Sequence, residues 1–246
     1  MPRVLLVEDD PNECLLYAET LRGDGYDVVV ANDGPHVVAD LGGGTGFLLA
    51  QVKARHPEVA LVDLDTCPIQ LGEAARVGIP TVQRSVTEFR RDEVSSDGRR
   101  VMYIMRSVFH YLGETGLTPA LRHVREQARP GELFIHQTAC FETDREAACL
   151  NELYRMMNTH KWYPTVERVR RSAEEAGWRV RSVTPVPSLR LTAHDLSTRY
   201  HVDRETVLRI RNEIGAAFAD ARDVFHRTHD AFVAHLKYEV FECEAV

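Results

Sequence analysis

The stretch "VVADLGGGTG", Val37–Gly46, places four glycines within five positions, directly after an apolar run that reaches an aspartate. Glycine loses more conformational entropy on folding than any other residue, so glycines concentrated at a strand end indicate a tight bend or a close approach of another group. The stretch therefore predicts a strand that runs into a tight loop at the edge of a sheet.

Strand-like and helix-like segments alternate on both sides of this stretch. Strands are predicted over 3–8, 26–31, 36–41, 59–64, 81–86, 101–106, 132–137, 178–186 and 237–245. Helices are predicted over 11–25, 47–56, 68–78, 117–128, 143–158 and 165–177, with a mostly helical block over 192–235. This alternation is typical of an α/β fold in which helices cover both faces of a mostly parallel sheet.

Composition excludes several classes of protein. The 246 residues are 44% hydrophobic and 27% charged, enough for one large α/β domain with small appendages. A net charge of -7 argues against nucleic acid as the default partner. The five cysteines form no C-x-x-C pair, which predicts reduced thiols in a cytoplasmic protein. No apolar run approaches the roughly 18 residues of a membrane span.

The glycine loop is suited to a nucleotide-like ligand. A strand that reaches Asp40 and opens through glycines into a helix places backbone N–H groups at the carboxyl edge of the sheet. The pattern G-x-G-x-G matches neither the G-x-G-x-x-G of dinucleotide folds nor the G-x-x-x-x-G-K-[ST] of phosphate loops. The next strand brings Asp63 to its tip, where a carboxylate can accept two ribose hydroxyls.

Three later motifs accompany the loop in a fixed order: "MYIMRSVFHYL" (102–112), "REQARPGELFIHQ" (125–137) and "KYEVFECEA" (237–245). Together with "DLGGGTG", these motifs resemble class I S-adenosylmethionine-dependent methyltransferases. In order, the three motifs are similar to the fourth strand of that family, the loop before its fifth strand and its antiparallel seventh strand. Glu132 stands where that family has a glycine. The resemblance covers residues 36–186 and the last strand. It implies a Rossmann-like seven-stranded sheet, mostly parallel, with the last strand antiparallel between the fifth and sixth.

The resemblance also implies S-adenosyl-L-methionine as cofactor. The glycine loop would wrap its methionine part, Asp63 would hold the ribose hydroxyls, and "QRSVTEF" (83–89) would flank the adenine. Ser85 stands where many members have an acidic residue. The implied cofactor-binding residues are Asp40, Gly42, Gly43, Gly44, Gly46, Asp63, Leu64, Ser85, Val86, Thr87 and Arg106.

His110 is the candidate catalytic residue. The pairing of "DLGGGTG" with "RSVFHYLGE" is most similar to small-molecule O-methyltransferases, whose turn reads H-D-W and whose histidine is the general base. Here Tyr111 and Leu112 replace the last two residues of that turn. An imidazole that titrates near neutrality suits removal of a hydroxyl proton, and predicts a rate that rises with pH. The alternative is a histidine that only packs in the turn.

Four further residues are candidates for contact with the methyl acceptor: His136, His160, Trp162 and Tyr163. The alternatives are a satisfied strand histidine for His136 and an aromatic helix end for "THKWYP" (159–164).

The N-terminal segment 1–35 resembles the opening of a response-regulator receiver domain. Glu8, Asp9 and Asp10 match its acidic cluster, but "GPHVVADLGG" follows directly and leaves no room for the helix before the third strand. We interpret the segment as a truncated receiver-like part that serves as structural cover or an interaction surface. Metal binding or phospho-signalling is the alternative, and no other metal site is predicted.

Residues 191–214 have the pattern of a helix-turn-helix, with a turn at "YHVD" and a second helix that carries Arg209 and Arg211. This pattern raises a rival function, a DNA-binding regulator whose methyltransferase-like domain senses a ligand. The preferred interpretation is a helical cap on the acceptor pocket. The predicted domains are a receiver-like segment (1–35), a cofactor-binding core (36–190), a helical cap (191–236) and a final core strand (237–246).

The sequence thus predicts a cytoplasmic methyltransferase that moves a methyl group to a small-molecule acceptor, at a hydroxyl, by direct displacement. Neither nucleic acid nor a membrane is expected as a partner. The oligomeric state stays open, with a homodimer as one alternative.

Overall fold

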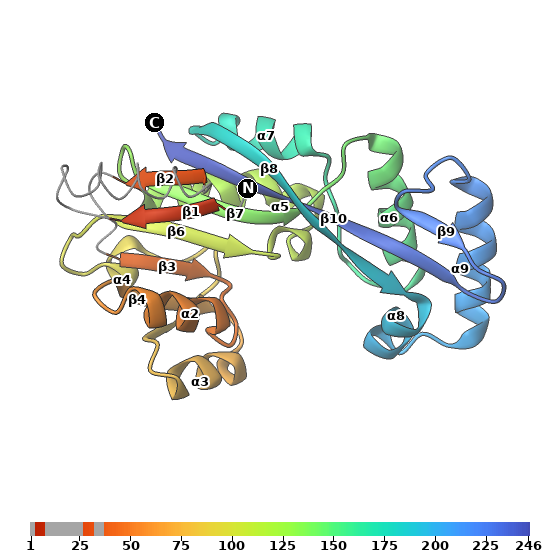
Figure 1. Cartoon of the computed structure of the whole chain (residues 1–246), viewed down its shortest axis with the longest axis horizontal. Helices are drawn as coiled ribbons and strands as arrows, with labels where there is room; N and C mark the ends of the chain where they lie inside the picture. Colours follow the sequence, from red (N-terminus) through yellow and green to blue (C-terminus); the bar gives the residue numbers. More distant parts are fainter. Residues whose placement is uncertain (1–2, 8–26, 32–36) are drawn as a thin grey trace. The chain divides into compact units, whose positions relative to one another are not determined.

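The computed structural model describes residues 3–7, 27–31 and 37–246 (Figure 1). These residues form a mixed α/β fold, mostly parallel in its strands, with the last strand antiparallel and helices around the sheet. The chain divides into two compact units. The first comprises Met1–Arg84 and Phe89–Tyr103, and the second comprises Ser85–Glu88 and Ile104–Val246.

Two short strands open the chain. β1 (Arg3–Val7) pairs in parallel with β2 (Asp27–Ala31) as a separate two-stranded sheet, which confirms two predicted strands. The predicted helix 11–25 and the acidic cluster Glu8, Asp9 and Asp10 lie outside the described residues. The receiver-like interpretation of residues 1–35 therefore stays a prediction.

The first unit is built on parallel strands in the order β5-β4-β3-β6. Their bounds are β3 (Val37–Leu41), β4 (Ala60–Asp65), β5 (Thr81–Gln83) and β6 (Val101–Arg106), of which residues 101–103 belong to this unit. All five residues of β3 are buried, as expected for a central strand covered on both faces. The helices of this unit are α2 (Phe47–Arg55), α3 (Pro68–Arg76) and α4 (Arg91–Val94).

The second unit continues from the end of β6 in the order β6-β7-β10-β8. β10 (Phe232–Ala245) runs antiparallel to both β7 (Leu133–Ala139) and β8 (Trp178–Thr192), which confirms the predicted insertion of the last strand between the fifth and the sixth. The remaining elements are η1 (Phe109–Tyr111), α5 (Gly113–Gln127), α6 (Asp144–Met156), α7 (Val166–Glu175), α8 (Ala193–Tyr200), α9 (Arg204–Ala217) and β9 (Phe225–Arg227).

Side-chain caps begin four helices of the second unit. Thr143, Thr165, Thr192 and Asp203 each accept a hydrogen bond from the backbone N–H three residues later. Each cap satisfies an N–H group that has no partner within the helix. The caps explain why α6, α7, α8 and α9 begin directly after these residues.

The predicted helical block 192–235 is wrong at its C-terminal end. α9 ends at Ala217, residues 225–227 form β9, and β10 begins at Phe232 rather than at residue 237. The apolar run "AFVAHL" (231–236) fits a helix and a strand equally well in isolation. Pairing with β9 on one side and with β8 on the other decides for the strand.

The extended ends of β8 and β10 support a hydrophobic core under α6, α8 and α9 (Figure 1). Its fully buried members include Leu153 of α6, Leu196 of α8, Ile210 of α9 and Ala234 of β10. The turn between α8 and α9 is confirmed, with His201 in the left-handed conformation at φ 53°. The inner face of α9 is thus committed to packing.

Ile210→Ala tests this packing. Removing a fully buried side chain from a close-packed core costs about 2–5 kcal/mol of unfolding free energy. Urea unfolding followed by circular dichroism measures the loss. Arg209→Ala, one residue earlier on the exposed face, should change the unfolding free energy by less than about 0.5 kcal/mol. Equal effects of the two variants would contradict the described face of α9.

Candidate functional site

The glycine loop that follows β3 needs glycine for two separate reasons. Gly42, Gly44 and Gly46 have φ of 79°, 66° and 70°, in the left-handed region that L-residues other than glycine rarely adopt. Gly43 has no such φ, but a Cβ built on it would lie 2.5 Å from Oδ1 of Asp63 and 2.8 Å from Cγ of Asp40. The loop can therefore close only because these four positions carry no side chain.

The loop leads into the N-terminus of α2. Gly46 is the N-cap residue of α2. Because glycine has no side chain, it provides no acceptor for the first N–H groups of this helix. The loop is anchored from below, because the Gly42 N–H donates to the Leu64 carbonyl at 2.6 Å. A glycine loop that ends in an uncapped helix N-terminus is suited to the polar atoms of a ligand.

Asp63 lies directly under this loop, and its side chain is fully buried. Within the part of the chain that the structure describes, neither of its carboxylate oxygens has a partner with full hydrogen-bond geometry. Burial raises the pKa of Asp63 to about 7, the negative charge of Asp65 acts in the same direction, and the Gly43 N–H opposes both. The first unit therefore holds a carboxyl group that retains a proton more readily than an exposed aspartate.

Asp65 is the acidic residue at the tip of the strand, and the sequence analysis missed it. The predicted strand ended at residue 64, whereas β4 continues to Asp65. Asp65 is partly exposed and accepts hydrogen bonds from the N–H of Gly44 at 3.1 Å and of Cys67 at 2.8 Å. The predicted helix already began at Pro68, so this proline did not fix which residue ends the strand before it.

The predicted adenine segment forms a turn beyond β5. The strand was expected over 81–86 but ends at Gln83, because the chain turns at Ser85, whose Oγ accepts the N–H of Thr87 at 3.2 Å. Thr87 is exposed and Ser85 is partly exposed, whereas Val86 is buried. Leu64 is a core residue, and Arg106 is exposed at the end of β6.

His110 lies in η1, just after β6, and its side chain is almost fully buried. Its ring stacks on Tyr163 at 5.4 Å and contacts Tyr111 at 4.2 Å, measured between ring centroids. Its carbonyl accepts the N–H of Trp162 at 3.0 Å. Burial lowers the pKa of His110 to about 3, and the positive charge of Lys161 adds to this effect. The imidazole is therefore neutral at physiological pH.

Of the other predicted acceptor residues, His136 is corrected to a core residue. Its ring is fully buried, stacks on Phe241 at 4.9 Å and contacts Phe109 at 5.1 Å. Its Nδ1 lies 2.7 Å from Oγ1 of Thr138, and burial lowers its pKa to about 3. His160 is exposed. His160, Trp162 and Tyr163 stay candidates for acceptor contact.

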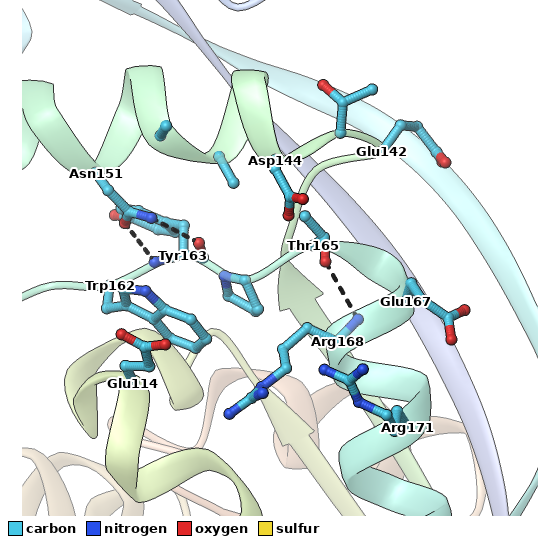
Figure 2. Close-up of a pocket in the computed structure, with 14 residues that line it drawn as sticks. Glu114, Glu142, Asp144, Asn151, Trp162, Tyr163, Thr165, Glu167, Arg168 and Arg171 are labelled. Atoms are coloured by element: carbon cyan, nitrogen blue, oxygen red, sulfur yellow. Dashed lines mark hydrogen bonds between the residues drawn. The ribbon is translucent and has the colours of Figure 1, made fainter.

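Trp162 and Tyr163 line a cavity of about 670 Å³ in the second unit (Figure 2). Asn151 fixes this segment, because its side-chain amide exchanges two hydrogen bonds with the backbone of Tyr163, at 2.7 and 2.9 Å. The side chains of Arg168 and Arg171 extend from α7 toward the cavity (Figure 2). The charged lining is completed by Glu114, Glu142, Asp144 and Glu167. The volume is in the range of small-molecule pockets.

In residues 3–7, 27–31 and 37–246, no group of three or more His, Cys, Asp and Glu side chains is arranged to hold a metal ion. None of the helices in these same ranges combines the length and the apolar character that a membrane crossing requires.

Comparisons with known proteins identify the fold. No family model matches the chain, and no curated protein matches it. The crystal structure of the YcgJ protein from Bacillus subtilis matches with a TM-score of 0.68 at 14% identity, over 85% of this chain and 92% of that one. Geranyl diphosphate C-methyltransferase from Streptomyces coelicolor A3(2), solved with Mg²⁺, geranyl diphosphate and S-adenosyl-L-homocysteine, matches with a TM-score of 0.55 at 10% identity, over 85% and 72%.

The methyltransferase CalO6 is more similar in sequence, with 28% identity and a TM-score of 0.50, over 61% of this chain and 53% of that one. The chain thus has the Rossmann-like α/β fold of these methyltransferases, as predicted.

Asp63→Asn tests the buried carboxyl group. Because Asp63 binds its proton more tightly in the folded state, the free energy of unfolding decreases as the pH rises from about 4 to about 7. Asp63→Asn removes this titration, so the variant gains stability relative to wild type by about 3 kcal/mol over that interval. Urea unfolding at a series of pH values measures the difference.

Asp65→Asn is a second variant for that series. It keeps the Asp63 carboxyl but removes the neighbouring charge that helps to raise its pKa, so the pH dependence should weaken without disappearing. It also loses charged hydrogen bonds to Gly44 and Cys67, so it should be less stable than wild type at pH 7. Parallel pH dependences of wild type and Asp63→Asn would show that the Asp63 carboxyl is not perturbed.

Proposed function

We propose that this protein binds S-adenosyl-L-methionine and transfers its methyl group to a small-molecule acceptor. The observation that carries the proposal is the glycine loop, which lies against the carboxyl groups of Asp63 and Asp40 in a chain with the fold of methyltransferases. Gly43 lets the loop pack directly on the carboxyl groups of Asp63 and Asp40, and Gly46 leaves the N-terminus of α2 without a side-chain cap. The backbone N–H groups there suit the polar atoms of a ligand.

In this proposal the residues of the first unit hold the methionine part and the ribose of the cofactor. The N–H groups of the loop and of α2 receive the methionine part. We assign the ribose hydroxyls to Asp65 rather than to Asp63, because Asp65 is partly exposed at the strand tip whereas Asp63 is fully buried. Asp63 then supports the loop from below. Ser85, Val86 and Thr87 stay the candidates for the adenine.

When bound, the cofactor supplies a methyl group on a positively charged sulfur. The chain contributes alignment of the acceptor oxygen with that methyl group and removal of the hydroxyl proton. His110 is the residue proposed to accept the proton at a ring nitrogen. With a pKa of about 3 the imidazole is neutral at every pH above about 4 but is a weak base, so in this proposal the proton passes to it only as the oxygen attacks the methyl group.

The small size of the acceptor rests on the cavity beside Trp162. Its volume of about 670 Å³ suits a molecule of drug or metabolite size rather than a polymer. One protein of similar fold, the geranyl diphosphate methyltransferase of Streptomyces coelicolor, was solved with such a small acceptor. A hydroxyl is the proposed accepting group because the turn that carries His110 resembles that of small-molecule O-methyltransferases.

Calorimetry with S-adenosyl-L-homocysteine tests the cofactor. Gly44→Val forces a branched side chain into φ 66° and to within 2.9 Å of Oε1 of Gln70, so binding should weaken at least about tenfold. Asp65→Ala removes a charged acceptor and should weaken binding by about ten- to a hundredfold. Gly72→Ala, where an added Cβ meets no atom within 4 Å, is the control and should bind as wild type does. Binding of NAD in place of the homocysteine compound would refute the proposal.

Turnover of His110→Ala tests the base. Its affinity for the cofactor should stay unchanged, while turnover decreases by roughly 10²-fold or more. Because the pKa of His110 is about 3, the wild-type rate should be flat between about pH 5 and 8 as far as His110 is concerned. This replaces the increase near neutrality that the sequence predicted. His194→Ala, exposed on α8, is the control, and full activity of His110→Ala would make His110 structural.

A further inference from the structure

Lys161 has surroundings unlike those of the other lysines. The chain contains three lysines, Lys53, Lys161 and Lys237. Lys53 donates to the Gly78 carbonyl at 2.8 Å, and Lys237 forms an ion pair with Glu146 at 2.6 Å. Lys161 is partly buried in the extended segment between α6 and α7.

Three tyrosines from three different elements surround the Lys161 ammonium, and we call them the tyrosine cage. Nζ lies 4.6 Å from the ring centroid of Tyr111 in η1, 5.3 Å from that of Tyr200 in α8 and 5.8 Å from that of Tyr154 in α6. It also donates a hydrogen bond to the hydroxyl of Tyr200 at 2.8 Å. Ring faces stabilise a cation but do not neutralise it.

No carboxylate of the described residues forms an ion pair with Lys161. Burial lowers the pKa of Lys161, the charge of Arg199 acts in the same direction, and Tyr111 opposes both. A half-buried ammonium without a negative partner is costly, because it has lost part of its hydration. An anion that enters the cage would supply the missing charge.

The cage adjoins the proposed base. Tyr111 contacts both groups, with its ring 4.2 Å from the His110 ring and 4.6 Å from Lys161 Nζ. The next residue after Lys161 donates its N–H to the His110 carbonyl, which joins the two backbones. A group held at Lys161 therefore lies beside His110.

We propose that Lys161 and the tyrosine cage bind a carboxylate carried by a planar acceptor. A single ammonium matches a single negative charge, and the ring of Tyr111, which is 64% exposed, can contact a flat molecule beside it. This inference rests on the proposed function, because it assigns a chemical class to the acceptor of that reaction. It makes Lys161 a specificity residue, since a neutral analogue leaves the ammonium without a partner.

Benzoate and benzamide are a matched pair of probes, because they share shape and differ in charge. Trp162 lies next to Lys161 and the second tryptophan, Trp178, is buried, so tryptophan fluorescence reports binding near the cage. In protein loaded with S-adenosyl-L-homocysteine, wild type should bind benzoate at least about tenfold more tightly than benzamide.

Lys161→Met should lower the affinity for benzoate to that for benzamide and leave benzamide binding unchanged. Lys161→Arg should keep the preference, and Lys53→Met, which removes the same charge from α2, should behave as wild type. Equal affinities for the two probes in wild type, a preference that survives in Lys161→Met, or no saturable binding of benzoate would each overturn the inference.

Calorimetry with S-adenosyl-L-homocysteine on the same samples keeps the two proposals separate. Unchanged cofactor affinity in Lys161→Met shows that the variant is folded and that the proposed function stands, whatever the outcome with benzoate. Loss of cofactor binding in wild type would refute the proposed function and leave the anion preference of the cage to be decided by the two probes.

Discussion

The contact between Gly43 of the glycine loop and a buried carboxyl group is the constraint on which the first unit depends. A Cβ at Gly43 would overlap the carboxyl groups of Asp63 and Asp40, so the loop stays close to β4 only as glycine. The entropic cost of the glycines is offset by the hydrogen bonds that the closed loop makes with Leu64 and Asp65. The position of the loop, the carboxyl groups and the start of α2 therefore depend on one another.

The second unit depends on a different interaction, the antiparallel pairing of β10 with β7 and β8. Because β8 and β10 extend beyond the sheet core, they carry α6, α8 and α9 on a hydrophobic core of their own. That core brings Tyr154 and Tyr200 to the segment of Lys161. A neutral imidazole and an ammonium without a carboxylate partner in the described residues then lie in one aromatic environment, and the proposed anion site rests on this ammonium.

Much of the fold was predictable because its signals are local. The strands β3, β6 and β7 and the helices α2, α6 and α7 follow from apolar periodicity and from capping residues. The errors occur where local signals are ambiguous. The run 231–236 suits both periods, β5 ends early at a serine turn, and η1 and α4 are too short to give a periodic pattern.

The sequence by itself determined the order of elements, the glycine loop and the presence of an acid after it, since neighbouring residues encode strand ends, turns and caps. Only the tertiary structure decided which acid reaches the strand tip, because that depends on where β4 ends against β3 and β5. It also decided that His136 is a core residue and that Lys161 meets three tyrosines. Those contacts join segments that lie far apart in the chain. Burial lowers the pKa of His136, an effect that the residue type alone does not reveal.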